Sequence, residues 1–175
     1  YFCVTRFTDY VKGHNLRLNK EPTADQIINT IPKDAATRYK EVVFCGYGEP
    51  TLRLDIIKEV SGFLKKQGIA IRLNTNGHGN LIHNRSILPE LKGLIDIVSI
   101  SVNATDPAEY VKTCHPQFGE ITFSKVMEFI KDAKEHLPYV EITTVIRPGL
   151  TVERFQNLAK ELSVDFRARI YNEVG

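Results

Sequence analysis

Five short runs rich in branched apolar residues recur along the chain, and longer amphipathic stretches separate them. Each run has the length and the β-branched content typical of a buried strand. Between the runs, apolar residues return every three or four positions, as from Leu54 to Leu64, which is the period of a helix packed on one face. The runs that predict strands are residues 41–45, 69–74, 95–102, 139–146 and 164–171.

Residues that favour helix ends agree with this division. Thr23 and Thr151 each precede a periodic run, as helix N-caps do, and Gly68 stands where the helix after residue 54 should stop. Shorter periodic stretches at 126–130 and 155–162 predict two further helices. The sequence contains no low-complexity segment, solenoid-length repeat or Pro/Gly-rich linker, so we expect one domain over residues 1–175.

The alternation of strands and helices predicts an α/β fold with parallel strands and crossover helices. The pattern leaves two architectures open, an open doubly wound sheet and a full or partial barrel. In both, the loops after the carboxyl ends of the strands carry the chemistry. The segments after the predicted strands are all polar or turn-forming: Gly-Tyr-Gly-Glu-Pro, Thr-Asn-Gly-His, Asn-Ala-Thr-Asp, Arg-Pro-Gly and Asn-Glu.

Composition narrows the class of protein only slightly. The net charge of +2, the charged fraction of 25% and the hydrophobic fraction of 42% are ordinary for a soluble domain and do not indicate a nucleic-acid partner. No apolar run reaches the length of a membrane span. Three widely spaced cysteines favour a reducing compartment over a disulfide framework, so we expect a cytoplasmic protein. The chain begins at Tyr1, and we expect an upstream segment.

The turn Gly-Tyr-Gly-Glu-Pro at residues 46–50 is the most distinctive motif. Gly46 and Gly48 permit positive φ angles and a close approach of a ligand, and Pro50 fits the first turn of a helix. A carboxylate beside exposed amide groups suits a ligand with an ammonium and a carboxylate, so Glu49 is a candidate ligand for an ammonium group. The alternative interpretation is a helix-entry turn with a solvated glutamate.

Four segments resemble one enzyme family. Tyr1-Phe2-Cys3 resembles the last three positions of the Cys-x-x-x-Cys-x-aromatic-Cys motif of the radical S-adenosylmethionine (radical SAM) superfamily. Residues 47–50 resemble its Gly-Gly-Glu-Pro motif, with Tyr47 in place of a glycine. The segments "LNTNG" (73–77) and "SISVNA" (99–104) resemble its third and fourth strand ends. Within the superfamily, "TRFTDY", "KGHNL" and "FCGYGEPTLR" are most similar to the TatD-associated radical SAM proteins.

The resemblance implies a partial (β/α)6 TIM-like barrel whose first strand and first two cluster cysteines precede Tyr1. It implies a [4Fe-4S] cluster with Cys3 as a ligand, S-adenosylmethionine (SAM) as second cofactor, and an electron donor such as flavodoxin or ferredoxin. The substrate, a small molecule or a protein, is left open, and no residue is assigned a catalytic role. The cofactor-binding residues that it implies are Phe2, Gly46, Tyr47, Gly48, Glu49, Pro50, Thr75, Asn76, Ser101 and Asn103. Because side chains alternate along a strand, we expect Ser101 and Asn103 to face the same side.

Other polar residues have two interpretations each. Cys45 ends an apolar run, so we expect a small buried hydrophobe, whereas His78 follows "TNG" at the predicted mouth. Three late arginines either meet an anionic substrate or form ordinary ion pairs: Arg147, Arg167 and Arg169.

Two other functions compete with a radical SAM enzyme. One is a cluster-free β/α-barrel enzyme in which Glu49 transfers protons, and the other is a non-catalytic SAM-binding module.

Overall fold

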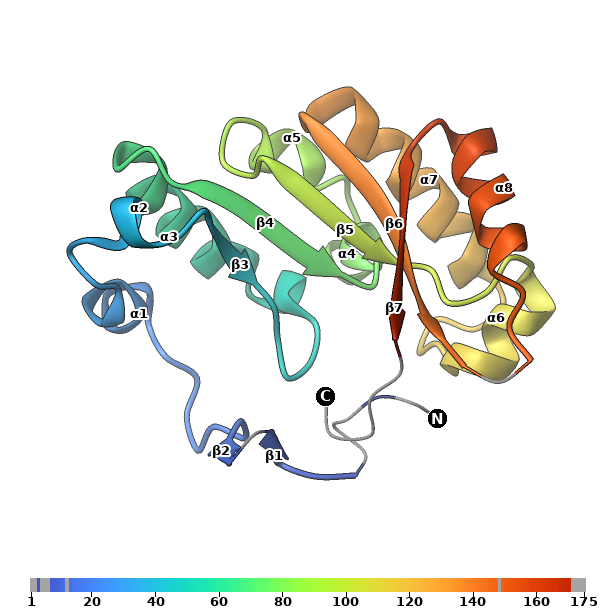
Figure 1. Ribbon diagram of the computed structural model, residues 1–175, viewed down its shortest axis with the longest axis horizontal. Coiled ribbons are helices and arrows are strands. Elements are labelled where there is room, and N and C mark those ends of the chain that lie inside the picture. Colours follow the sequence, from blue (N-terminus) through green and yellow to red (C-terminus); the bar gives the residue numbers. More distant parts are fainter. Residues whose placement is uncertain (1–2, 4–6, 12, 148, 171–175) are drawn as a thin grey trace.

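A five-stranded parallel sheet forms the centre of the computed structural model, which describes residues 3, 7–11, 13–147 and 149–170. Each strand pairs with the next one in the sequence, so the order contains no reversal (Figure 1). A doubly wound sheet reverses its strand order at a switch point, and a barrel does not. The strands are β3 (Glu41–Phe44), β4 (Ala70–Thr75), β5 (Ile97–Ser101), β6 (Tyr139–Ile146) and β7 (Asp165–Ile170).

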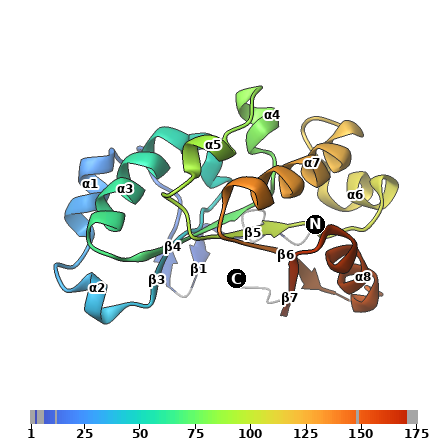
Figure 2. The same ribbon diagram turned by 90° about the horizontal axis from the view of Figure 1, so that it is seen from above.

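The sheet curves into an arc with the helices on its outer side and an open concave face on the other (Figure 2). This arrangement confirms the predicted partial TIM-like barrel. The longest helices, α3 (Leu54–Lys66), α7 (Ile121–His136) and α8 (Val152–Leu162), are crossovers between successive strands. Shorter helices are α1 (Ala24–Thr30), α2 (Ala35–Arg38), the 3-10 helix η2 (Pro50–Arg53), α4 (Gly79–His83), α5 (Leu88–Leu91) and α6 (Pro107–Cys114).

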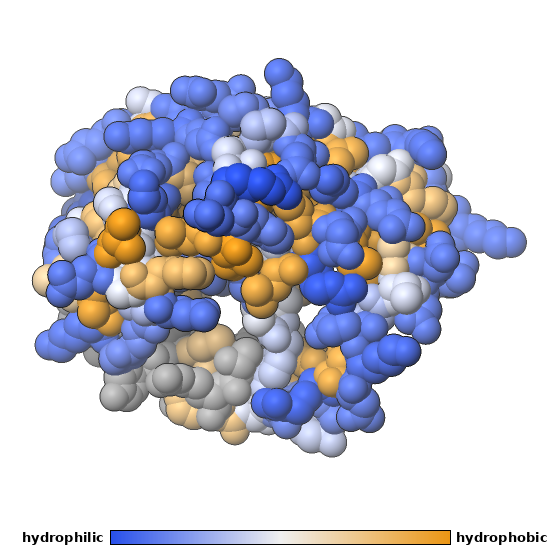
Figure 3. Space-filling model, turned by 180° about the vertical axis from the view of Figure 1, so that it is seen from behind, coloured by the Kyte–Doolittle hydropathy of each residue, from blue (hydrophilic) through white to orange (hydrophobic). Residues whose placement is uncertain are grey.

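The hydrophobic core lies between the helices and the outer face of the sheet. Leu73, Ile100 and Ile142 are fully buried strand residues, and they belong to the same cluster as Leu64 of α3 and Phe129 of α7. The view from behind looks onto this helix-covered side, where hydrophilic residues dominate the rim (Figure 3). Within the described residues, no helix is long and apolar enough to span a membrane.

The predicted bounds of β3 to β6 hold to within two residues, whereas α7 and α8 begin three to five residues before the periodic stretches that predicted them. Thr23 forms a capping box with Gln26, and Gly68 adopts a φ of +72° just past the end of α3. The residue pattern missed the short helices α2, α4 and α5, because four or five residues are too few to display a helical period. Tyr171, the last position of the predicted final strand, lies outside the described residues.

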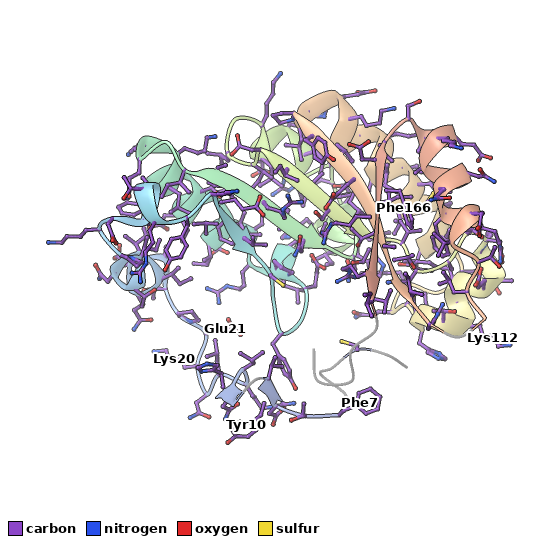
Figure 4. The ribbon with its side chains drawn as sticks, in the orientation of Figure 1. Phe7, Tyr10, Lys20, Glu21, Lys112 and Phe166 are labelled. Carbon is purple, nitrogen blue, oxygen red and sulfur yellow. The ribbon has the colours of Figure 1, made fainter. Side chains whose placement is uncertain are left out.

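A small hairpin follows the segment that contains Cys3. Strands β1 (Tyr10–Val11) and β2 (His14–Asn15) pair antiparallel and lie apart from the main sheet (Figure 1). The side chains of Phe7 and Tyr10 point away from the sheet and are exposed (Figure 4). The sequence pattern did not predict this hairpin, since two-residue strands carry no alternation.

Gly77 lies in the loop after β4 and is packed so closely that an added side chain should destabilise the fold. Gly93 serves as a control for the backbone strain alone. Gly77 and Gly93 have φ angles of +78° and +76°, so a side chain strains the backbone equally at both positions. A Cβ at Gly77 would lie 3.1 Å from Ile100 and 3.2 Å from Val126, whereas nothing lies within 4 Å of one at Gly93. We expect Gly77→Ala to lower the free energy of unfolding by about 1–3 kcal/mol more than Gly93→Ala does in urea titrations. Equal losses would contradict this.

Candidate functional site

The Gly-Tyr-Gly-Glu-Pro turn connects β3 to η2 at the carboxyl edge of the sheet. Gly48 has a φ of +139°, a conformation that favours glycine. Gly46 does not adopt a positive φ, contrary to the expectation for both glycines, but a Cβ there would lie 3.2 Å from the Gly48 carbonyl oxygen. The two glycines therefore allow a tight turn for different reasons.

The carboxylate of Glu49 joins this turn to the end of β4. Its Oε1 accepts hydrogen bonds from the backbone N–H of Thr51 at 3.1 Å, the Thr51 hydroxyl at 2.7 Å and the Thr75 hydroxyl at 2.7 Å. Its Oε2 accepts from the backbone N–H of Asn76 at 2.8 Å. Glu49 is thus the N-cap of η2, as the helix-entry interpretation expects, and also a bridge between neighbouring strand ends.

Tyr47, which stands where the motif that residues 47–50 resemble has a glycine, attaches the hairpin to the turn. Its hydroxyl lies 2.7 Å from the Thr8 carbonyl oxygen and 2.8 Å from a carboxylate oxygen of Asp9. Arg17 donates to the same Asp9 oxygen at 2.8 Å and lies 5.9 Å from the centre of the Tyr47 ring. Hydrogen bonds from Arg17 and Tyr47 lower the pKa of Asp9 below its usual value. The turn and the hairpin are therefore linked through one side chain.

The end of β4 presents polar groups that are already paired and one that is not. Thr75 is buried, and its hydroxyl oxygen also accepts from the Gly77 N–H at 3.1 Å. The Asn76 amide oxygen accepts from the backbone N–H of His78 at 2.9 Å. Asn74, which pairs in register with Ser99 of β5, has a buried Oδ1 without a hydrogen-bond partner. Asn74 was not among the predicted cofactor-binding residues, although it belongs to the "LNTNG" segment.

Five buried side-chain atoms in the described part of the chain have no hydrogen-bond partner. Ser61, Glu90 and Thr105 contribute three of them, from helices and a loop. The other two, Asn74 Oδ1 and Arg169 Nε, are the ones that belong to strands. Buried polar atoms are usually paired, so an unpaired one on the open sheet face marks a position where a water molecule or a ligand can supply the missing partner.

The predicted alternation of Ser101 and Asn103 ends with the strand. Ser101 is the last residue of β5, and its hydroxyl oxygen accepts from Arg169 at 3.0 Å. Asn103 lies beyond the strand with a φ of +57°, and its amide oxygen accepts from the Val145 N–H at 3.1 Å. The left-handed backbone directs the Asn103 side chain to the backbone of β6, so the period of two does not apply there.

His78 is part of the packed interior rather than an open mouth. Its Nε2 lies 2.8 Å from the Tyr110 hydroxyl, and its ring meets Phe118 edge-on. Burial lowers the pKa of His78 to about 4 and raises the pKa of Tyr110. His78 is therefore neutral at neutral pH and connects the loop after β4 to α6.

The concave face carries a buried ion cluster, which we call the Glu141 cluster. Glu141 is 5% exposed, and its Oε1 accepts from Arg72 at 2.8 Å, from Arg167 at 2.9 and 3.0 Å, and from Ser99. Arg72 also pairs with Glu41 at 3.0 Å, which raises its pKa. Ordinary ion pairing thus accounts for Arg167. Arg147 donates to the Asn103 carbonyl oxygen at 2.9 Å.

The three cysteines differ in exposure, and one of them contradicts its prediction. Cys45 is exposed, so its predicted burial is wrong, because the concave face leaves the end of β3 uncovered. Cys114 ends α6 and is half-buried, which raises the pKa of its thiol to about 11. Cys3 is exposed, and Phe2 lies outside the described residues. Among the described residues, the group of potential metal ligands is Asp132, Glu135 and His136, on the outer helix α7.

A parallel half-barrel with glycine turns and polar groups at its carboxyl edge is a partial β/α barrel, an architecture in which the loops at this edge carry the function. The family model of the Radical SAM superfamily matches residues 1–162, and the chain belongs to this superfamily. Its members are enzymes, and they require a reductant. The predicted family is therefore confirmed.

Curated relatives extend beyond the length of this chain. It is 32% identical over 123 residues to an uncharacterized protein of Methanocaldococcus jannaschii, 70% of this chain and 40% of that protein. It is 28% identical over 151 residues to a putative glycyl-radical enzyme activating enzyme of the same organism, 84% of this chain and 60% of that protein. A molybdenum cofactor biosynthesis protein of Caenorhabditis elegans is 32% identical over 126 residues, 69% of this chain and 20% of that protein.

Removing the Tyr47 hydroxyl should release the hairpin from the turn. We expect Tyr47→Phe to raise amide hydrogen exchange of Tyr10 and Leu16 at least severalfold, because the links to Thr8 and Asp9 are lost while the ring remains. Exchange in β4 should not change. Tyr39→Phe, at an exposed tyrosine, is the matched control. Unchanged exchange in the hairpin of Tyr47→Phe would show that the hydroxyl does not hold it.

Neutralising Glu49 should weaken the fold itself. In Glu49→Gln an amide NH₂ replaces one acceptor oxygen among groups that donate to it, so we expect a loss of about 1–3 kcal/mol in the free energy of unfolding. Chemical denaturation of the 175-residue chain measures it. Glu59→Gln, on the exposed side of α3, provides a control with the same chemical change. If both variants matched the wild type, the hydrogen bonds to Glu49 would contribute nothing.

Proposed function

We propose that this chain is the core of a radical SAM enzyme that holds a [4Fe-4S] cluster through Cys3 and binds SAM along the carboxyl edge of β3, β4 and β5. When bound, the cluster and SAM supply a radical that abstracts hydrogen from a substrate. The family match and the exposed position of Cys3 support this proposal. A cytoplasmic location, a flavodoxin or ferredoxin as electron donor and the likeness to TatD-associated proteins remain predictions.

The observation that carries the proposal is the unpaired Asn74 Oδ1. The SAM ammonium group needs acceptors, and the Glu49 carboxylate already accepts from three residues. Asn74 lies next to Thr75, one of those donors, and its buried oxygen has no protein partner in the described chain. We therefore assign the ammonium contact to Asn74 Oδ1, with Glu49 as a positioning residue that fixes the ends of β3 and β4.

The other predicted cofactor residues take supporting places around Asn74. Gly46, Gly48 and Pro50 shape the turn, where Gly48 keeps the backbone open to a ligand. Thr75 and Asn76 hold the β4 end to that turn. Ser101 presents a hydroxyl for the ribose or methionine part of SAM, and Asn103 fixes the β5 end against β6. Tyr47 belongs to the side of the site that contacts the hairpin after Cys3, and Phe2, which lies outside the described residues, stays a predicted cofactor residue.

Substitutions at Asn74 separate ligand binding from stability. Asn74→Ala removes an acceptor that no described protein group uses, so we expect SAM affinity to fall at least tenfold with no loss of unfolding free energy. Asn74→Asp keeps an acceptor and adds a charge opposite the ammonium, so it should bind SAM as tightly as the wild type or more tightly. Calorimetry on the complete protein, prepared without oxygen, measures the affinities.

An iron assay and a control variant show whether a change in SAM affinity is specific to Asn74. Iron content should stay at about four irons per chain in each variant, which separates SAM binding from cluster assembly. Asn157→Ala, on the exposed side of α8, should leave SAM affinity unchanged. Wild-type SAM affinity in Asn74→Ala would refute the assignment. Absence of SAM binding and of 5′-deoxyadenosine formation in the reduced wild type would refute the function and favour a cluster-free enzyme.

A further inference from the structure

Arg169 differs from the other arginines of the concave face in having no carboxylate partner among the described residues. Arg167 and Arg169 lie two residues apart on β7, so both side chains project to the same face. Arg167 pairs with Glu141, whereas the one hydrogen bond of Arg169 within the described part of the chain runs from Nη2 to the Ser101 hydroxyl at 3.0 Å. Its Nε is buried and has no acceptor.

An unpaired guanidinium in this position is unfavourable in the absence of a ligand. Burial and repulsion from Arg167 lower the pKa of Arg169, although the group remains a cation at neutral pH. Buried charges in proteins are normally paired, because desolvation without a partner destabilises the fold. Glu141, the carboxylate whose charge acts on Arg169 among the described residues, is already shared by Arg72 and Arg167. The charge of Arg169 thus stays available to an anion.

We propose that Arg169, held in place by Ser101, forms an anion-binding subsite that receives a carboxylate or phosphoryl group of the substrate. A guanidinium donates in parallel to two oxygens of such a group, and its free Nε–H with the second N–H of Nη2 provides that fork. The Ser101 hydroxyl accepts from Nη2 and so fixes the guanidinium, and its own proton is left for the SAM contact assigned to Ser101 above. The assignment of this anion to a substrate rests on the proposed function.

The position of Arg169 favours the substrate over SAM as the source of the anion. The residues assigned to the SAM ammonium and to its surrounding turn lie on β3 and β4, and Arg169 lies on β7. Three strand spacings of about 4.8 Å separate the backbones of β4 and β7, and the Arg169 side chain reaches across to Ser101 of β5 with its Nη2. The free Nε lies closer along the side chain to β7 than Nη2 does, so the donor left for an anion is on the β7 side of that contact. We therefore assign the anion to the substrate, and SAM titrations distinguish it from the SAM carboxylate.

Titration of small anions tests the subsite on the complete protein, prepared without oxygen. Malonate and inorganic phosphate are titrated by calorimetry at constant ionic strength. We expect Arg169→Gln to weaken binding of the preferred anion at least tenfold, and Arg169→Lys to weaken it less because the charge remains. Arg154→Gln, at an exposed arginine of α8, removes the same charge elsewhere and should change nothing. The tighter of the two anions identifies a carboxylate or a phosphoryl group.

SAM titrations of the same variants decide the source of the anion. The proposal expects SAM affinity of Arg169→Gln to stay within twofold of the wild type. A tenfold loss of SAM affinity would assign Arg169 to the SAM carboxylate and overturn the proposal. Anion binding that is equal in wild type and Arg169→Gln would also overturn it. If wild type binds anions through Arg169 but neither binds SAM nor forms 5′-deoxyadenosine, the anion subsite stands and the proposed radical function falls.

Discussion

The buried carboxylate of Glu141 is the constraint on which the open side of this sheet depends. Helices cover the outer face, so its core needs only apolar side chains, but the concave face has no second layer among the described elements (Figure 2). There, Glu141 accepts from donors on three different strands, β4, β5 and β7. Removing one partner of such a buried pair typically destabilises a protein by about 3–5 kcal/mol. The Glu141 cluster thus fixes these strands from the uncovered side.

The same cluster determines which groups remain free to bind. Because one carboxylate serves Arg72 and Arg167, the next arginine along β7 is left without a counter-charge. Glu49 and Asn74 differ in the same way: the acceptor oxygens of Glu49 are paired and that of Asn74 is not. Glu49 is saturated by donors of its own turn and of β4, and the neutral side chain beside it keeps an unused acceptor. In both places the conspicuous charged residue maintains the fold and its neighbour is available to a ligand.

Tyr47 connects the turn to the segment that follows Cys3. A glycine at this position would leave the turn without a side chain, whereas the Tyr47 hydroxyl reaches Thr8 and Asp9 and its ring faces Arg17. The turn that faces the proposed SAM site therefore also anchors the hairpin that follows the proposed cluster ligand. The departure from the family motif has a structural reason in this chain.

The sequence by itself determined the five parallel strands, the long helices, the family and the edge at which polar groups gather. These features follow from period, capping and motif, which are local properties of neighbouring residues. Only the tertiary structure decided which polar groups are already paired. Arg167 and Arg169 are the same residue type on the same face of one strand, yet one meets Glu141 and the other does not. That difference arises because partners on other strands, distant in sequence, either supply an acceptor or leave one to be supplied by a ligand.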